Sequence, residues 1–180
     1  ATCCKDGSWQ VATVLDGPSP VTLTADPQNP DVVYAGTQGN GVYRSADGGR
    51  NWDSLGLAGR VVKSLAVSPH DPDAIYAGVK PALVYKTNDG GKNWVELEGF
   101  RRVPNRWWWF SPAEPPFRAY VNALAVSPAE PYVVLAGIEF GALVRSEDGG
   151  RTWSGHLPDA MRDCHVLKFH HHNGQWVYEA

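Results

Sequence analysis

Two acidic side chains and one histidine are the candidates for acid–base chemistry in this chain of 180 residues. Asp163 and His165 stand two positions apart, and Glu139 lies in the short sequence Ile-Glu-Phe-Gly. A pair of carboxyl groups about 5–10 Å apart is the arrangement that cleaves glycosidic bonds. We therefore take Asp163, Glu139 and His165 as candidate catalytic residues, with Arg118 as a cation for the same set. The alternative is that each is a solvated loop charge.

An aromatic segment at 101–118 supplies the candidates for ligand binding. It contains three consecutive Trp, two Phe and four Arg. Indole rings stack on the apolar C–H faces of a sugar, and polar side chains bond its hydroxyl groups. The alternative is that the rings plug a channel or pack on a neighbouring part of the protein, and at least one Trp packs in either case. The candidate ligand-binding residues are Trp107, Trp108, Trp109, Arg106, Arg118 and Tyr120.

An internal repeat organises the elements that must position these residues. The segments 45–52, 87–94 and 146–153 each read Ser/Thr-x-Asp-Gly-Gly-x-Asn/Thr-Trp. A Pro stands 20 residues before each Asp, and a Gly that ends an apolar run stands 9 residues after each Pro. Two markers at the same offsets indicate a repeat of about 42 residues. The second and third of these eight-residue segments are 59 residues apart, which makes 101–118 an insertion of about 17 residues.

Each repeat predicts four short antiparallel strands. In the unit 61–97, three apolar runs are separated by turn sequences, and a fourth run alternates with period two. No segment has a helical period, and four strands in about 42 residues is the size of a propeller blade. In each eight-residue segment, hydroxyl and carboxylate oxygens accept from turn N–H groups, and the indole packs on the neighbouring blade. These structural residues are Ser45, Asp47, Trp52, Thr87, Asp89, Trp94, Ser146, Asp148 and Trp153.

The eight-residue segments resemble the Asp-box, or bacterial neuraminidase repeat. That motif occurs in sialidases, xyloglucan-degrading glycoside hydrolases, sortilin-type receptors and photosystem assembly factors, all of them β-propellers. The resemblance covers about 21–155 and implies that the active site of an enzyme of this kind lies on the face opposite the boxes. It leaves two functions open: glycan binding or hydrolysis on an aromatic face, or a non-catalytic scaffold for protein interaction. It slightly favours a location outside the cytoplasm.

The repeat predicts an all-β chain, a single partial propeller domain over 1–180 with about three and a half blades. The blades are expected at about 21–55, 61–97 and 121–155, with a half blade at 164–179. Residues 1–15 are either a ring-closing strand or a simple lead-in strand. Propellers close with roughly four to eight blades. We therefore expect the segment to be part of a six- to eight-bladed ring, which further blades or a second chain would close.

Composition excludes several other classes of function. The net charge of −3 indicates no nucleic-acid partner, and the absence of an apolar run of 18 residues indicates no membrane span. Three Cys do not form a disulfide framework, and Cys164 and His165 point to opposite sides of a strand, which argues against a nucleophile pair. The run His-His-His-Asn at 170–173 is expected to project its adjacent side chains in different directions, so that they do not bind one metal ion together. We therefore expect no metal and no cofactor.

Overall fold

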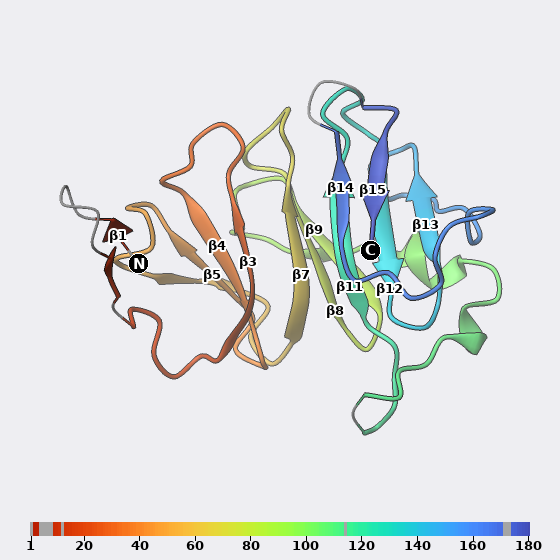
Figure 1. Cartoon of the computed structure of the whole chain (residues 1–180), viewed down its shortest axis with the longest axis horizontal. Coiled ribbons are helices and arrows are strands. Elements are labelled where there is room, and N and C mark those ends of the chain that lie inside the picture. Colours follow the sequence, from red (N-terminus) through yellow and green to blue (C-terminus); the bar gives the residue numbers. More distant parts are fainter. Residues whose placement is uncertain (1, 4–8, 12, 114, 171–173) are drawn as a thin grey trace.

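The computed structural model describes residues 2–3, 9–11, 13–113, 115–170 and 174–180. Four antiparallel sheets stand side by side along the long axis of the molecule (Figure 1). Blade one contains β3 (Pro20–Ala25), β4 (Val33–Thr37), β5 (Val42–Ser45) and β6 (Asp53–Gly56). Blade two contains β7 (Val61–Val67), β8 (Ile75–Lys80), β9 (Leu83–Thr87) and β10 (Val95–Glu96). Blade three contains β11 (Val121–Val126), β12 (Val134–Ile138) and β13 (Leu143–Ser146), and blade four contains β14 (Leu167–Phe169) and β15 (Val177–Glu179).

Blade three has three strands and not the predicted four. Beyond its box, the N–H groups of Ser154 and Leu157 donate to carbonyls of β13, at 2.8 and 2.9 Å, so the chain still follows that strand. Two N–H groups of β13 are taken by side chains, however: Arg145 donates to Ser154 Oγ at 2.9 Å and Leu143 donates to His156 Nδ1 at 3.1 Å. Side-chain acceptors thus replace the backbone carbonyls that a fourth strand would offer.

The amino-terminal residues form a small hairpin of their own. β1 (Thr2–Cys3) pairs with β2 (Trp9–Gln10) and with no strand of blades one to four. Of the single strand expected in residues 1–15, the described residues show only these two short strands, and residues 4–8 between them lie outside the described residues. Within the described part of the chain, no helix has both the length and the apolar character needed to cross a bilayer.

The hydrophobic core lies between adjacent blades. One cluster joins blades one and two, a second joins blades two and three, and a third joins blades three and four. The blades approach each other closely at the repeated glycine of each second strand. A Cβ on Gly36 would lie 2.7 Å from Val62, one on Gly78 would lie 2.7 Å from Val121, and one on Gly137 would lie 2.7 Å from Cys164 Sγ. Each glycine thus makes room for the inner strand of the next blade.

The box turns are closed by the same set of hydrogen bonds in each blade. In blade two, Thr87 Oγ1 donates to Asp89 Oδ1 at 2.7 Å and accepts from the N–H of Gly91 at 3.0 Å. The carboxylate of Asp89 then accepts from the backbone N–H of Asn93 at 2.9 Å. Equivalent bonds join Ser45, Asp47, Gly49 and Asn51 in blade one, and Ser146, Asp148, Gly150 and Thr152 in blade three. These bonds lower the pKa of all three Asp side chains, to about 2 for Asp89 and Asp148.

The three box indoles have related but unequal surroundings. Trp94 Nε1 donates to the carbonyl of Leu55 in blade one at 2.8 Å. Trp52 and Trp153 instead donate to a glycine carbonyl of their own turn, at 2.9 and 3.0 Å. Trp153 also meets the ring of Phe100 edge-on at 5.2 Å. The prediction that each indole packs on the neighbouring blade therefore describes Trp94 best, whereas Trp153 meets Phe100, which lies just before the insertion.

Candidate functional site

The candidate site lies at the end of the blades away from the boxes. In blades one to three, the turn between the second and third strands donates an N–H to a carbonyl of the chain that leads into the inner strand of the next blade. These bonds run from Gly41 to Arg60 at 3.3 Å, from Ala82 to Ala119 at 2.8 Å, and from Gly141 to Arg162 at 2.8 Å. The loops that connect successive blades are thereby held against these turns. The inserted segment is one of those loops.

Arg106 anchors the insertion. Its guanidinium donates to the carbonyl of Phe100 at 3.1 Å and to that of Ala82 in blade two at 2.9 Å. The same group lies 5.8 Å from the ring centre of Phe100 and 5.4 Å from that of Trp109. Burial lowers the pKa of Arg106 below its usual value. These contacts place the short 3-10 turns η1 (Glu98–Arg102) and η2 (Arg106–Trp108) on blades two and three.

The three consecutive tryptophans divide into two groups. Trp109 is half-buried, packs on the core between blades two and three, and lies 5.7 Å from Phe100. Trp107 and Trp108 stack on each other at 4.3 Å and remain 73% and 67% exposed. A pair of exposed, stacked indoles presents an apolar surface that has no partner within the described residues. The insertion therefore both packs and displays aromatic rings.

A pocket of about 470 Å³ opens between the insertion and blade three. Trp108, Trp109 and Phe140 supply its aromatic rings. Its polar groups come from Asn105, His156 and Arg162, and no Asp or Glu of the described residues lines it. Burial lowers the pKa of His156, and the nearby Arg162 lowers it further, which favours the neutral imidazole. The pocket thus combines apolar ring faces with hydrogen-bonding groups and one cation.

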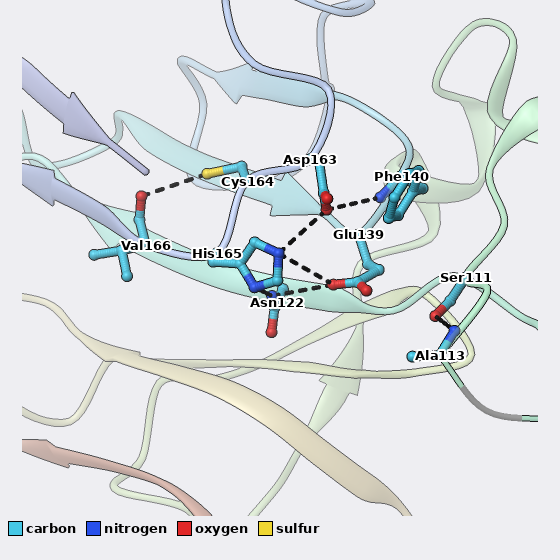
Figure 2. A network of polar contacts seen from close by, with 9 residues as sticks. All are labelled: Ser111, Ala113, Asn122, Glu139, Phe140, Asp163, Cys164, His165 and Val166. Carbon is cyan, nitrogen blue, oxygen red and sulfur yellow. Dashed lines mark hydrogen bonds and ion pairs between the residues drawn. The ribbon is translucent and has the colours of Figure 1, made fainter.

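The three predicted catalytic residues come together beside this pocket (Figure 2). His165 Nε2 lies 3.4 Å from Asp163 Oδ1 and 4.0 Å from Glu139 Oε2. Asn122 Nδ2 lies 3.3 Å from Glu139 Oε2 and 3.1 Å from His165 Nδ1. The backbone N–H of Phe140, whose side chain lines the pocket, donates to Asp163 Oδ1 at 3.4 Å. We call Glu139, Asp163 and His165 the polar cluster.

Of the six predicted ligand-binding residues, Trp108 and Trp109 line the pocket, whereas Arg106, Trp107, Arg118 and Tyr120 do not. Tyr120 is buried, and the ammonium groups of Lys63 and Lys80 lie 4.8 and 5.7 Å from the centre of its ring. Arg118 lines a smaller, neighbouring hollow with Phe117. Neither residue belongs to the polar cluster or to the larger pocket. The structure thus separates these two from Trp108 and Trp109.

Seven lining residues were not among the predicted site residues, and four of these have polar or aromatic side chains: Asn105, Phe140, His156 and Arg162. Asn105 has a left-handed backbone conformation, with φ of 61°, which turns the chain into η2. His156 and Arg162 fall in the connection between the expected third blade and the half blade. The signal that could have found His156 is Ser154-Gly155-His156, which follows the third box and does not alternate like a strand.

The remaining sequence motifs lie away from the pocket. Cys164 is a buried free thiol whose Sγ bonds to the carbonyl of Val166 at 3.4 Å, and burial raises its pKa to about 11. The ring of His170 lies 6.0 Å from that of Trp176, while 171–173 lie outside the described residues.

Comparison with known proteins identifies the fold. No family model and no curated protein matches the sequence. Among solved structures, the chain is similar to an ancestral GH74 enzyme, with a TM-score of 0.67 and 20% identity over 94% of this chain. It is also similar to the GH74 enzyme of Niastella koreensis, with a TM-score of 0.62 and 16% identity over 84%. YCF48 bound to D1 peptide gives a TM-score of 0.59 and 14% identity over 88%.

These likenesses establish a β-propeller fold. The chain is all-β, and its antiparallel sheets correspond to about three and a half propeller blades. It spans 23% and 24% of the two GH74 enzymes and 48% of the YCF48 chain. A propeller fold accommodates enzymes, receptors and assembly factors, so function has to be argued from the pocket itself.

Proposed function

We propose that this chain is a carbohydrate-binding propeller segment, and that the pocket beside the insertion holds a sugar ring. The observation that carries the proposal is the lining: Trp108, Trp109 and Phe140 face the same space as Asn105 and Arg162. Apolar rings match the C–H faces of a sugar, and the amide and guanidinium groups match its hydroxyl rim. The exposed Trp107–Trp108 stack extends this surface beyond the pocket for a longer glycan.

Binding without hydrolysis is the better-supported form of this proposal. An inverting glycosidase needs its two carboxyl groups about 6.5–9.5 Å apart, with space for a water molecule, and a retaining one about 5–5.5 Å. Ligand atoms of Glu139, Asp163 and His165 all lie within 4.8 Å of one another, so the two carboxylates lie closer together than either mechanism requires. The pocket lining among the described residues includes neither carboxylate.

Tryptophan fluorescence and calorimetry with a panel of oligosaccharides test this proposal. At least one glycan should change the emission of the protein, and Trp108→Ala should weaken its binding roughly tenfold, about 1.4 kcal/mol. Trp176→Ala is the matched control, because Trp176 is 61% exposed but lies in the turn between β14 and β15. If no glycan binds at millimolar concentration, or if both variants weaken binding equally, the proposal is wrong.

A second candidate is the binding of an extended peptide, and one observation favours it. The similar propeller YCF48 is described bound to a peptide, and the Trp107–Trp108 stack is an exposed apolar surface of the kind that peptide side chains cover. A peptide library screened on the same protein separates the two functions. Peptide binding that Trp107→Ala removes, without binding of any glycan, would favour the scaffold function.

We also propose that further blades, from the same polypeptide or from a second chain, complete a ring with this segment. Among the described residues, β15 pairs with β14 alone and so has one unpaired edge, and open edges pair readily with other strands. Light scattering would show a defined dimer if a second chain supplies the missing blades. A strictly monomeric protein would exclude that arrangement and leave closure within one longer polypeptide.

A further inference from the structure

We propose that the polar cluster of Glu139, Asp163 and His165 is a binding site for one divalent first-row transition-metal ion. The three residues come from two segments that are distant in sequence: the β12–β13 turn and the connection that leads into β14. Figure 2 shows their polar groups converging on one point at the end of blade three. The inference is independent of the proposed glycan binding, because the cluster lies outside the residues that line the aromatic pocket.

The separations between the ligand atoms suit a shared ion. Two ligand atoms that are each about 2.1 Å from one ion, at a tetrahedral angle, are about 3.4 Å apart, and they are about 3–4 Å apart in other common geometries. His165 Nε2 lies 3.4 Å from Asp163 Oδ1 and 4.0 Å from Glu139 Oε2. Both separations are longer than a good hydrogen bond. The three groups therefore surround a space of ionic size without closing it by direct contact.

The charge of Glu139 gives an independent reason to expect a cation. The side chain is 5% exposed, and a buried carboxylate is costly unless a positive charge accompanies it. Among the described residues, its one ion-pairing partner is His165, at 4.0 Å, and its hydrogen-bond donor is the neutral amide of Asn122 at 3.3 Å. No Lys or Arg of the described chain pairs with it. A divalent ion would supply the missing positive charge.

Groups around the cluster orient the ligands. Phe140 N–H donates to Asp163 Oδ1, which holds that carboxylate toward the imidazole. The amide of Asn122 faces His165 Nδ1, so Nε2 is the ring nitrogen that faces the two carboxylates. Asn122 Nδ2 contacts both His165 Nδ1 and Glu139 Oε2, so this one amide positions two of the three groups. Such outer contacts set the orientation of metal-binding histidines.

The ligand set indicates the class of ion. One imidazole with two carboxylates suits Zn²⁺, Mn²⁺, Fe²⁺ or Co²⁺, whereas Mg²⁺ and Ca²⁺ prefer oxygen ligands alone. Three protein ligands leave coordination positions open to solvent or to a bound molecule. His165 is 57% exposed, so those positions face outward, next to Phe140 and the pocket. The site is therefore accessible from solution.

Calorimetric titration with Zn²⁺ and Mn²⁺ tests the site. The protein should carry Asn in place of His170, His171 and His172, because a run of His binds transition metals weakly by itself. In that background we expect one ion per chain, unaffected by millimolar Mg²⁺ or Ca²⁺. His165→Ala and Glu139→Gln should each lower the affinity more than tenfold. Asp159→Asn and His70→Gln, which change a carboxylate and an imidazole elsewhere, should not.

The variants also separate loss of the site from loss of folding. His165 is largely exposed, so His165→Ala should keep the thermal unfolding temperature of the metal-free protein, while removing the rise in that temperature that the ion produces. The inference is overturned if no ion binds in the His-replaced background. It is equally overturned if binding persists at unchanged affinity in both His165→Ala and Glu139→Gln.

Discussion

Replacing Gly78 with alanine tests how the blades are held together. Gly78 lies in β8, and its missing side chain leaves space for the inner strand of blade three. An added Cβ would lie 2.7 Å from Val121 Cβ and would also meet Ser64 Oγ. Val121 is fully buried, and Ser64 Oγ donates to the carbonyl of Val121 at 2.7 Å, so neither group can move away without disturbing the contact between blades. We therefore expect Gly78→Ala to destabilise the folded chain.

The expected loss follows from two opposed effects. Forcing a methyl group into a well-packed core costs about 1–3 kcal/mol. The alanine also reduces the freedom of the unfolded chain, which returns about 0.4–1 kcal/mol. The net loss in the free energy of unfolding is then about 1–2 kcal/mol, and for a chain of this size each kcal/mol lowers the melting temperature by about 2–4 °C.

The assay is thermal and urea unfolding followed by circular dichroism. Gly155→Ala is the matched control, because a Cβ there would have its nearest neighbour at 3.9 Å and the backbone is not left-handed. Its stability should stay within about 0.5 kcal/mol of the parent. Combining Gly78→Ala with Ser64→Ala should cost less than the sum of the two changes, since the hydroxyl clash disappears. Equal stability of Gly78→Ala and Gly155→Ala would refute this account of the packing between blades.

Three further results are expected. Trp94→Phe removes the indole bond to Leu55 and should cost about 0.5–1.5 kcal/mol in urea unfolding, whereas unchanged stability would contradict a role for that bond. The folded-state pKa values of Asp89 and Asp148 are lowered to about 2. The stability that these carboxylates provide is therefore present above about pH 4 and is lost as the pH falls toward about 2. In the double variant Asp89→Asn and Asp148→Asn, the melting temperature should depend less on pH over that range. Arg106→Ala removes the guanidinium bonds that tie the insertion to the carbonyls of Phe100 and Ala82, and should weaken glycan binding by the same tenfold as Trp108→Ala. Arg102→Ala, on an exposed side chain, should not.

The fold was predictable because its signals are local and occur three times. Each box brings its own turn bonds, as Thr87, Asp89 and Gly91 show in blade two, so eight residues specify a hairpin without help from distant parts of the chain. The missing fourth strand of blade three could not be predicted in the same way. The strand is missing because Ser154 Oγ and His156 Nδ1 take the place of backbone carbonyls as acceptors for β13. The alternation of apolar and polar residues in the sequence does not reveal this replacement.

The sequence drew attention to two of the aromatic residues that line the pocket, but it did not indicate which other residues would lie beside them. Trp108 and Trp109 drew attention as an aromatic run, yet which indole is buried depends on Arg106, whose bonds to Phe100 and Ala82 cross between segments. His156 and Arg162 were missed because their relevance comes from the fold that brings them beside the insertion. Sequence reasoning is weakest where partners come from different blades.

The two ends of the blades are built by different kinds of bond, and this explains why function is expected at only one of them. At the box end, each turn is closed by its own hydroxyl and carboxylate, so a change of residue there acts first on stability. At the other end, the turns donate to the chain that enters the next blade, as Gly141 does to Arg162. The side chains of these turns are then free to differ: the three sequences are Gln38-Gly-Asn-Gly, Lys80-Pro-Ala and Glu139-Phe-Gly. A surface held by backbone bonds can vary its side chains without losing its shape, which is the condition that a binding site on a repeat protein requires.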